Sequence, residues 1–326
     1  MAEKKKMDIK MADKRCAPSK FYTDGSCFSL KALQLIAKSH NNNSNTIHHI
    51  KITDNKAEMV KQLENVLANK CDNQICWTRL AIVEQIEDDI IKEDINENTF
   101  RPDGPKKRYE WLSTSDINDV ITQYQNKYTE FVFLGAVPAD FEEIKVLGIG
   151  DLDLDNFEKE GKSKLGMVIN LDDSRGNGSH WVALFVDLKK GHIYYFDSIG
   201  KKPYKRTKKF INKIVKYLYK KNYNKDININ NLLKITNKLL KSSKLEKNNI
   251  NESKNNTILN DLKIFDIRYN PIQHQFGNSE CGVYSINFIV RLVGGEKFDD
   301  ITENVTKDKE INKCRPVYFK NVNDFK

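Results

Sequence analysis

Two short runs of β-forming residues, 181–187 and 192–197, are separated by only four residues. Valine, phenylalanine and tyrosine recur in the runs, and the connection between them ends in Gly191. Runs of this kind joined by so short a connection pair antiparallel, so the pattern predicts a β-hairpin. The hairpin constrains the fold more than any other feature of the sequence, because a sheet has to bury at least one face against other elements.

Helical and strand patterns lie on both sides of the hairpin. Apolar residues recur at three- and four-residue spacing in several segments, which predicts amphipathic helices, whereas short apolar runs predict strands. The predicted helices lie at about 30–36, 59–67, 77–86, 117–124, 205–219 and 281–293, and the further strands at 131–134, 166–171 and 264–267. Helices and strands in this mixed order predict an α+β fold.

The chain divides into two predicted regions. Residues 1–100 combine a basic arm with a small helical N-terminal extension. A linker at 101–108, which contains proline and glycine, leads into the second region, 101–326, where Ser113 or Ser115 is expected to cap a helix. Within this region an Asn/Lys-rich segment at about 221–260 is expected to form a solvated insertion without a catalytic role.

Composition excludes several classes of protein. The chain has 326 residues, 39% of them hydrophobic, so it can bury a core and is expected to be neither disordered nor a disulfide-stapled miniprotein. No apolar run approaches the roughly 18 to 20 residues of a membrane span. Polar residues follow the first lysines, so no secretory signal is expected. The net charge of +9 tolerates nucleic acid or an acidic partner without requiring either.

The sequence contains six cysteines: Cys16, Cys27, Cys71, Cys76, Cys281 and Cys314. Cys71 and Cys76 form the one close pair, and no histidine or second pair lies nearby to complete a zinc site. We interpret five of the six as ordinary free or buried thiols in a reducing compartment. Cys281 is considered separately.

Three residues together predict a thiol nucleophile with its base. His180 begins the first hairpin strand and Asp197 ends the second, and antiparallel pairing brings these two positions alongside each other. Cys281 opens a predicted apolar helix, where the unpaired amides and the helix dipole stabilise a thiolate. A thiolate that attacks a carbonyl carbon, an imidazole that moves the proton and a carboxylate that orients the imidazole are the parts of a thiol protease site.

Gln275 lies six residues before Cys281, and its side-chain amide could form an oxyanion hole with the backbone N–H of Cys281. Gly282 removes a side chain beside the nucleophile, and Gly277 is expected to allow the backbone path that aims it. Taken singly, each candidate has an ordinary structural explanation, such as a partly buried histidine, a turn carboxylate or a packed thiol. Their order and local context together favour a catalytic site.

Three sequence elements resemble those of a known family. They are Ser179-His180-Trp181-Val182-Ala183-Leu184, Tyr195-Phe196-Asp197-Ser198 and Gln275-Phe276-Gly277-Asn278-Ser279-Glu280-Cys281-Gly282-Val283-Tyr284. In this order they resemble the signature of the SUMO-protease-like cysteine peptidases, a group that also contains the adenovirus maturation protease. The resemblance spans about residues 109 to 326, with the Asn/Lys-rich segment as a departure from the family pattern.

The resemblance implies a papain-like, SUMO-protease-like α+β core and hydrolysis of peptide or isopeptide bonds through an acyl-enzyme, with no metal and no cofactor. Cys281 is then the nucleophile, His180 the base, Asp197 its orienting partner and Gln275 the oxyanion donor. The family also implies a narrow tunnel for a Gly-Gly-type sequence between two tryptophans. Trp181 is expected to be one of them. Trp111 matches the other, with a plain core aromatic as the alternative.

Other segments resemble the proteases of nucleocytoplasmic large DNA viruses such as African swine fever virus, which also carry a helical N-terminal extension. The segments are 102–112, 133–141 and 312–319. This resemblance implies protein substrates with Gly-Gly-type cleavage sites in viral polyprotein or core precursors, and a location in the host cytoplasm and the virion. No membrane partner is expected, and the basic charge allows a weak association with nucleic acid.

Three alternatives stay open. The same site could remove SUMO or ubiquitin-like modifiers from host proteins. A related arrangement of histidine, acidic residue and cysteine could catalyse acyl transfer, as in some bacterial effectors. The chain could also be a basic nucleic-acid-binding protein with an inactive protease core, although no nucleic-acid-binding motif is present in the sequence.

Overall fold

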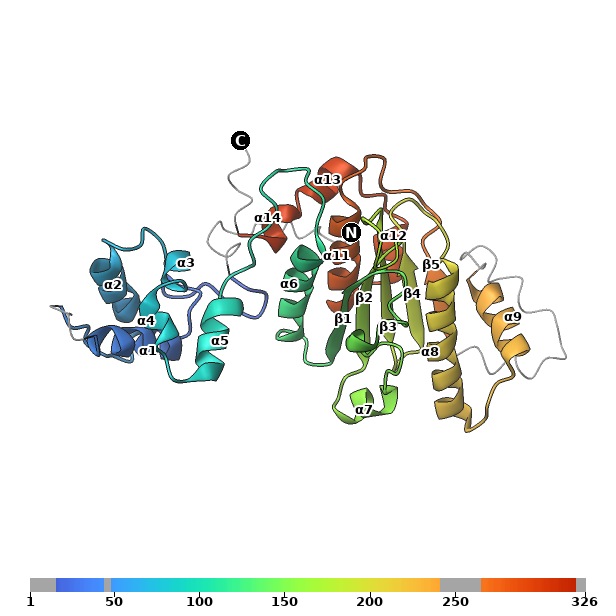
Figure 1. Cartoon of the computed structure of the whole chain (residues 1–326), viewed down its shortest axis with the longest axis horizontal. Helices are drawn as coiled ribbons and strands as arrows, with labels where there is room; N and C mark the ends of the chain where they lie inside the picture. Colours follow the sequence, from blue (N-terminus) through green and yellow to red (C-terminus); the bar gives the residue numbers. More distant parts are fainter. Residues whose placement is uncertain (1–15, 44–47, 241–264, 321–326) are drawn as a thin grey trace, which may run out of the picture. The chain divides into compact units, whose positions relative to one another are not determined.

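The computed structural model describes residues 16–43, 48–240 and 265–320 of the chain. These residues form two compact units (Figure 1). Residues 105–315 make up the unit that we call the sheet unit, and the residues up to Gly104 together with 316–320 make up the N-terminal unit. Within the described ranges, no helix is long and apolar enough to cross a membrane.

Short helices build the N-terminal unit. They are α1 (Leu30–Asn41), α2 (Lys56–Leu67), α3 (Gln74–Trp77), α4 (Ala81–Glu84) and α5 (Asp89–Glu97). Ser29 and Asn55 cap α1 and α2 by accepting backbone N–H groups, and each helix contributes apolar side chains to one core in which Phe28 stacks on Trp77. The amphipathic stretch predicted at 77–86 spans the end of α3 and all of α4.

Four cysteines of the N-terminal unit form disulfides, which corrects the expectation that they are free or buried thiols. Cys16 is bonded to Cys27, and Cys71 is bonded to Cys76. The chain turns back within each pair, so the two Cα atoms lie 5.3 Å and 5.6 Å apart, which is a separation that a disulfide spans. These four cysteines therefore give no support to the inference of a reducing compartment.

A five-stranded sheet forms the centre of the sheet unit. Its strands are β1 (Phe131–Val137), β2 (Lys164–Asn170), β3 (Trp181–Asp187), β4 (His192–Phe196) and β5 (Asp266–Tyr269). They lie side by side in chain order, and β1 and β5 are the edge strands. β1 pairs parallel with β2 and β5 pairs parallel with β4, whereas β2, β3 and β4 pair antiparallel. The predicted hairpin is confirmed, because β3 and β4 pair antiparallel with Ala183 opposite Phe196.

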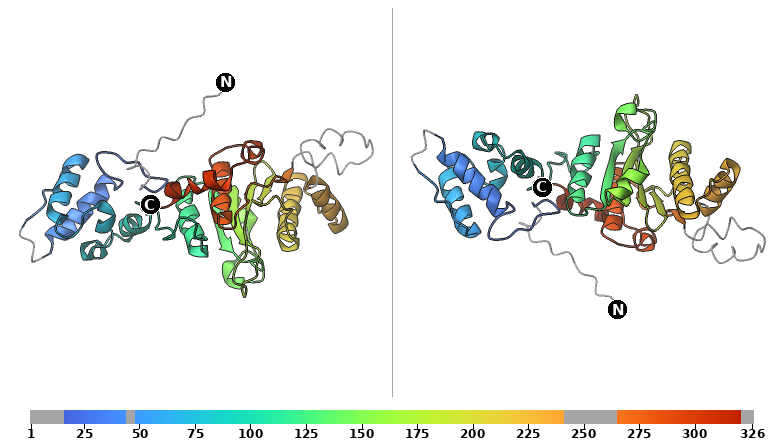
Figure 2. Two further views of the ribbon diagram at one scale, coloured as in Figure 1. Left: turned by 90° about the horizontal axis from the view of Figure 1, so that it is seen from above. Right: turned by 90° about the horizontal axis from the view of Figure 1, so that it is seen from below.

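Helices cover both faces of the sheet and give three layers (Figures 1 and 2). On one face lie α6 (Thr114–Gln125) and α11 (Cys281–Val293). On the other lies α8 (Lys205–Tyr223), with α9 (Ile229–Leu239) beside it. Ser113 caps α6 in a capping box with Asp116, as one of the two predicted alternatives. The arrangement confirms the predicted α+β fold.

The predicted insertion at about 221–260 contains the end of α8 and the whole of α9. Leu232 of α9 is buried and joins the core between the sheet and α8, so this part of the insertion is packed. Residues 241–264 lie outside the described residues. The remaining elements are η1 (Lys145–Leu147), α7 (Leu154–Lys159), α12 (Phe298–Thr302), α13 (Asp308–Asn312) and α14 (Arg315–Tyr318).

Candidate active site

His180 and Asp197 lie together at one end of the β3–β4 hairpin. His180 directly precedes β3 and Asp197 directly follows β4, and Nε2 of His180 is 2.7 Å from Oδ1 of Asp197. Asp197 is fully buried, and its Oδ1 also accepts the backbone N–H of Ile199 at 3.0 Å. The structure thus brings together the two residues that hairpin geometry predicted to be neighbours, in a setting where water does not weaken their interaction.

Asn270 holds the backbone of Asp197 in place, and the sequence reasoning missed it. Its Oδ1 accepts the N–H of Asp197 and its Nδ2 donates to the C=O of Asp197, both at 2.8 Å. Asn270 is fully buried and directly follows β5, the parallel neighbour of β4. The one signal in the sequence is an asparagine at the end of a predicted strand, which is weak in a chain so rich in asparagine.

Cys281 is the first residue of α11 and is a free, buried thiol. It interacts with the ring of His180. Burial lowers the pKa of His180, but the hydrogen bonds and charges of Asp197 and Cys281 outweigh burial and raise that pKa from 6.5 to about 9. Because Asp197 is bonded to Nε2, Nδ1 is the ring nitrogen left to face the thiol. A protonated imidazole beside a thiol at a helix N-terminus favours the thiolate.

Gln275 is buried in the loop before α11, with its side-chain amide fixed on both sides. Ser198 donates its hydroxyl to Oε1 of Gln275 at 2.6 Å, and Nε2 of Gln275 donates to the C=O of Gly277 at 2.9 Å. The backbone N–H of Gln275 donates to the C=O of Ser198 at 2.9 Å. One hydrogen of the amide is therefore engaged, and the second is free to serve as a donor. Ser198 belongs to the Tyr195–Ser198 element, but nothing in the sequence indicates its role as the orienting hydroxyl.

The two glycines beside the nucleophile differ in what they do. A Cβ atom on Gly282 would lie 2.9 Å from Cβ of Leu112, so glycine is needed for the close approach of α11 to the segment before α6. Gly277 does not adopt a left-handed backbone, and its expected part in aiming Cys281 stays a prediction. Its N–H donates to Oδ2 of Asp308 at 2.8 Å, and this bond holds the loop instead.

Trp111 and Trp181 line the same cavity, which has a volume of about 550 Å³. Trp181 is buried beside His180, and its Nε1 donates to the C=O of Leu112 at 3.0 Å. Trp111 is 43% exposed, so it is not the core aromatic of the alternative interpretation. The cavity is also lined by residues of the loop between β2 and β3, including Gly178. It therefore adjoins the loop that leads into His180.

Asn170, the last residue of β2, organises that loop. Its Oδ1 accepts the backbone N–H groups of Asp172 at 3.0 Å and of Ser179 at 3.2 Å. The N–H of Leu171 donates to the C=O of His180 at 2.9 Å and closes the base of the loop. Asn170 is a second positioning asparagine at a strand end that the sequence reasoning missed.

Across the described ranges, no cluster of His, Cys, Asp or Glu is arranged to hold a metal ion.

Comparison with known proteins identifies the family. Residues 158–323 match the Ulp1 protease family, C-terminal catalytic domain. A putative thiol protease of Acanthamoeba polyphaga mimivirus is 34% identical over 321 residues, covering 94% of this chain and 93% of that protein. A SUMO-1 cysteine protease of African swine fever virus is 24% identical over 313 residues, covering 88% of this chain and 99% of that protein.

A solved structure supports the fold. The crystal structure of an ASFV protease aligns with a TM-score of 0.57 at 21% sequence identity, covering 94% of this chain and 95% of that chain. At this identity the likeness concerns the fold, and the family assignment rests on the sequence matches. The chain belongs to the Ulp1 protease family and is a cysteine peptidase whose relatives include viral proteases.

Proposed function

We propose that this cysteine peptidase cleaves protein substrates after Gly-Gly-type motifs, using Cys281 as nucleophile, His180 as base and acid, and Asp197 to orient His180. The observation that carries the proposal is the ring of His180, bonded to Asp197 at 2.7 Å and interacting with Cys281 at the start of α11. The substrates are viral polyprotein or core precursors, and the enzyme acts in the host cytoplasm and the virion.

In the first half of the reaction, the Cys281 thiolate attacks the carbonyl carbon of the scissile bond. The electron pair of the C=O bond moves to oxygen, and the resulting oxyanion accepts hydrogen bonds from the second amide hydrogen of Gln275 and from the N–H of Cys281. That N–H lies in the first turn of α11, where backbone donors have no partner within the helix. The oxyanion then collapses, the C–N bond breaks, and the imidazolium of His180 gives its proton to the departing amine.

In the second half, a water molecule hydrolyses the thioester. Neutral His180 takes a proton from the water as its oxygen attacks the thioester carbon, and the C–S bond breaks to return the thiolate. The imidazolium and the thiolate are both restored, so no other reactant is consumed. The raised pKa of His180 supports this cycle because it keeps the imidazole protonated beside the thiolate at neutral pH.

The Gly-Gly preference rests on the cavity that Trp111 and Trp181 line. Trp181 is held rigidly by its bond to the C=O of Leu112. In this proposal the two indole rings flank the residues before the scissile bond, and glycine is favoured there because larger side chains are excluded.

The test is hydrolysis of fluorogenic peptides by the full chain. We expect cleavage after Gly-Gly, and a much slower reaction when either glycine is replaced by alanine. Cys281→Ala should remove cleavage, whereas Cys314→Ser should keep it, because burial raises the pKa of the Cys314 thiol and His180 does not contact it. Hydrolysis that survives Cys281→Ala would contradict the assigned nucleophile.

A second candidate function is the removal of a SUMO-type modifier from host proteins. It is favoured by the relative from African swine fever virus, which is named as a SUMO-1 cysteine protease. Incubation of the chain with modifier fusions and, in parallel, with Gly-Gly-containing precursor proteins distinguishes the two. Rapid processing of the fusion with an intact precursor would replace our proposal with this one.

An accessory association with nucleic acid is a further part of the proposal. α8 carries many lysines and no acidic residue. Phosphate binding at such a surface weakens as the salt concentration rises. If the affinity of the chain for DNA did not change with the salt concentration, phosphate binding at the lysines of α8 would be excluded.

A further inference from the structure

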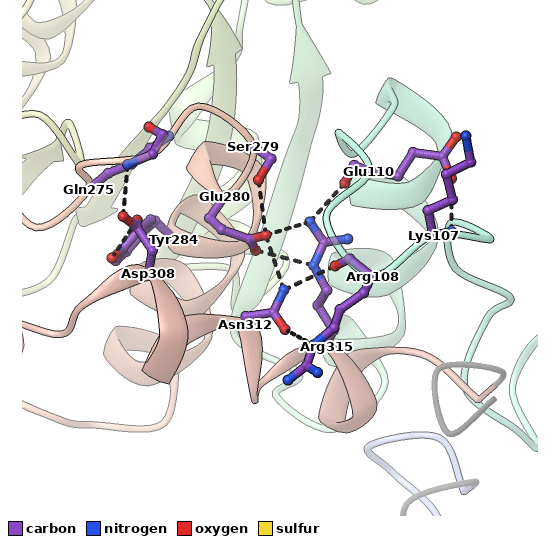
Figure 3. A network of polar contacts seen from close by, with 11 residues as sticks. Lys107, Arg108, Glu110, Gln275, Ser279, Glu280, Tyr284, Asp308, Asn312 and Arg315 are labelled. Carbon is purple, nitrogen blue, oxygen red and sulfur yellow. Dashed lines mark hydrogen bonds and ion pairs between the residues drawn. The ribbon is translucent and has the colours of Figure 1, made fainter. Parts of the chain in front are cut away.

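A buried ion pair lies directly beside the nucleophile. Glu280, the residue before Cys281, is 2% exposed, and its partner Arg315 is 1% exposed. Nε of Arg315 donates to one carboxylate oxygen of Glu280 and Nη2 donates to the other, each at 3.1 Å (Figure 3). This two-bond geometry fixes the orientation of the carboxylate as well as its position. Sequence reasoning assigned neither residue a role.

Asn312 extends the pair to the segment before the cavity. Its Nδ2 donates to Glu280 at 3.1 Å and to the C=O of Arg108 at 3.0 Å, while Nε of Arg108 donates to Oδ1 of Asn312 (Figure 3). Nη2 of Arg315 also donates to the C=O of Glu110 at 2.8 Å. The network therefore joins the start of α11 to the backbone that immediately precedes Trp111.

Stability alone does not explain this network. Removing two charges from water costs free energy that an ion pair recovers only when its geometry and hydrogen bonding are complete. Nη1 of Arg315 has no partner among the described residues, so the bonding of the pair is incomplete. An apolar pair of similar volume would fill the same space without that cost. What an apolar pair would not supply is a fixed direction for the residue before Cys281.

Asp308, at the start of α13, holds the beginning of the loop that runs from Gln275 to Glu280. Oδ2 of Asp308 accepts the N–H groups of Phe276 at 2.9 Å and Gly277 at 2.8 Å, and Oδ1 accepts the hydroxyl of Tyr284 at 3.2 Å. Asp308 begins α13 and Asn312 ends it. The loop from Gln275 to Glu280 is thus fixed near the amide donor by one residue of α13 and beside the nucleophile by another.

The pair also controls the charge next to Cys281. Glu280 immediately precedes Cys281 at the start of α11, and an unpaired carboxylate in this position would oppose formation of a thiolate. We propose that Arg315 is a positioning residue for Cys281, which fixes the first turn of α11 through Glu280 and cancels the charge of Glu280 beside the thiolate. This inference rests on the proposed role of Cys281 as nucleophile.

Several other charged groups on the elements packed against α11 have partners of their own. On the hairpin these are His180 and Asp197, which are bonded to each other. On α6, β2, α12 and α13, Asp116 is held by Ser113, Lys164 by Glu130, Asp299 by Arg268, Glu310 by Lys313 and Asp308 by the bonds described above. These elements also carry the charged residues Asp119, Asp300 and Lys309. The pair formed by Glu280 and Arg315 is therefore the one whose disruption places a new net charge on the residue before Cys281.

The test is the rate of Cys281 alkylation by iodoacetamide as a function of pH, measured on the full folded chain by mass mapping of the modified peptide. Arg315→Met leaves the carboxylate unpaired and should move the half-point of the profile to higher pH by about one unit. Glu280→Gln leaves the guanidinium unpaired and should move it to lower pH by a similar amount. The double variant should return close to the native profile.

Peptide hydrolysis supplies the second measurement. Arg315→Met should lower kcat at least about tenfold with little change in KM, because a displaced nucleophile affects the reaction more than binding. Arg268→Met is the control, because it breaks the partly buried ion pairs that Arg268, on the edge strand β5 of the sheet, makes with Asp266 and Asp299. It should lower the melting temperature without moving the alkylation profile.

Opposite shifts that cancel in the double variant are expected, and shifts of the same sign, or none, would overturn the inference. If Arg315→Met does not fold, Arg315→Gln carries the same test beside Glu280→Gln, because it keeps a polar side chain at the site and removes the charge. Failure of the proposed function would look different: Cys281→Ala would still hydrolyse peptides, whatever the alkylation profiles show.

Discussion

The N-terminal unit and the sheet unit hold their short elements in place by different chemistry. In the N-terminal unit, apolar packing around Phe28 and Trp77 is supplemented by the disulfides Cys16–Cys27 and Cys71–Cys76. In the sheet unit both cysteines are free, and buried polar side chains make directed hydrogen bonds around the candidate site. Cysteine therefore closes loops in the N-terminal unit and supplies the proposed nucleophile in the sheet unit.

This difference follows from what each unit has to fix. Apolar packing is non-directional, and a disulfide restricts mainly the unfolded chain, so both stabilise a fold without aiming a particular side chain. Hydrogen bonds depend on angle and so fix orientation. The buried asparagines, glutamine and ion pair of the sheet unit are therefore expected to matter more for catalysis than for stability, with the opposite balance in the N-terminal unit.

The largest expected effect is that of Asp197→Asn on hydrolysis. The change keeps the shape of the side chain but removes the charge that holds His180, and we expect kcat to fall by about 10⁴-fold. The control is Asp187→Asn at the other end of the same hairpin, where Oδ1 accepts the N–H groups of Lys189 and Lys190. Near-native kcat for Asp197→Asn would show that directed bonds do not dominate in the sheet unit.

The pH dependence of His180 gives the next prediction. Its pKa is raised from 6.5 to about 9, so the protonated form is favoured in the folded state. Protonated His180 therefore stabilises the folded chain. This stabilisation is complete below pH 6.5 and is lost as the pH rises through about 9. We expect kcat/KM to fall on the alkaline side near pH 9. If kcat/KM of the native chain fell instead near pH 6.5, the ordinary pKa of histidine, Asp197 and Cys281 would not hold the proton on His180.

Breaking the first disulfide tests the N-terminal unit. A link that closes so short a loop is expected to contribute about 3 kcal/mol to the free energy of unfolding. Replacing both Cys16 and Cys27 by alanine should lower the free energy of unfolding of this unit by that amount, measured by chemical denaturation. Peptide hydrolysis by the sheet unit under native conditions should change little. A loss of hydrolysis without a loss of stability would reverse the contrast between the units.

The smallest expected effect is that of Ser198→Ala. The hydroxyl donates to Oε1 of Gln275 and so directs the amide nitrogen the other way. Its loss should lower kcat about fivefold, because a neutral hydrogen bond contributes about 1 kcal/mol, while KM stays close to native. The control is the same substitution in a Gln275→Ala background, where no further loss is expected. A further loss there would assign Ser198 a role independent of Gln275.

The parts of the site that were predictable depend on local signals. The β-rich runs around residues 188–191 define a hairpin by themselves, and this places His180 beside Asp197 without any knowledge of the rest of the chain. Cys281 is recognisable because a polar loop changes to an apolar helix at that residue. The overall mixture of helices and strands was accessible for the same reason, since period and turn chemistry are properties of short windows.

The parts that were missed depend on distant packing. Glu280 and Arg315 are 35 residues apart, and nothing in a short window distinguishes a buried charge from a solvated one. Asn270 acts on a residue 73 positions earlier in the sequence. The disulfide partners were misjudged because their spacing reports only distance along the chain, whereas pairing depends on how the helices bring the Cα atoms together.

Gly282 and Leu112 lie where α11 approaches the segment before α6. A Cβ atom at 282 would lie 2.9 Å from the leucine side chain, so the two positions share one small volume. The nearest atom is Cβ of Leu112, which every residue except glycine has, so related sequences should keep glycine at the position of Gly282 wherever that of Leu112 carries a side chain. The backbone C=O of Leu112 accepts the bond from Trp181, so the close approach that glycine permits also helps to hold one wall of the cavity.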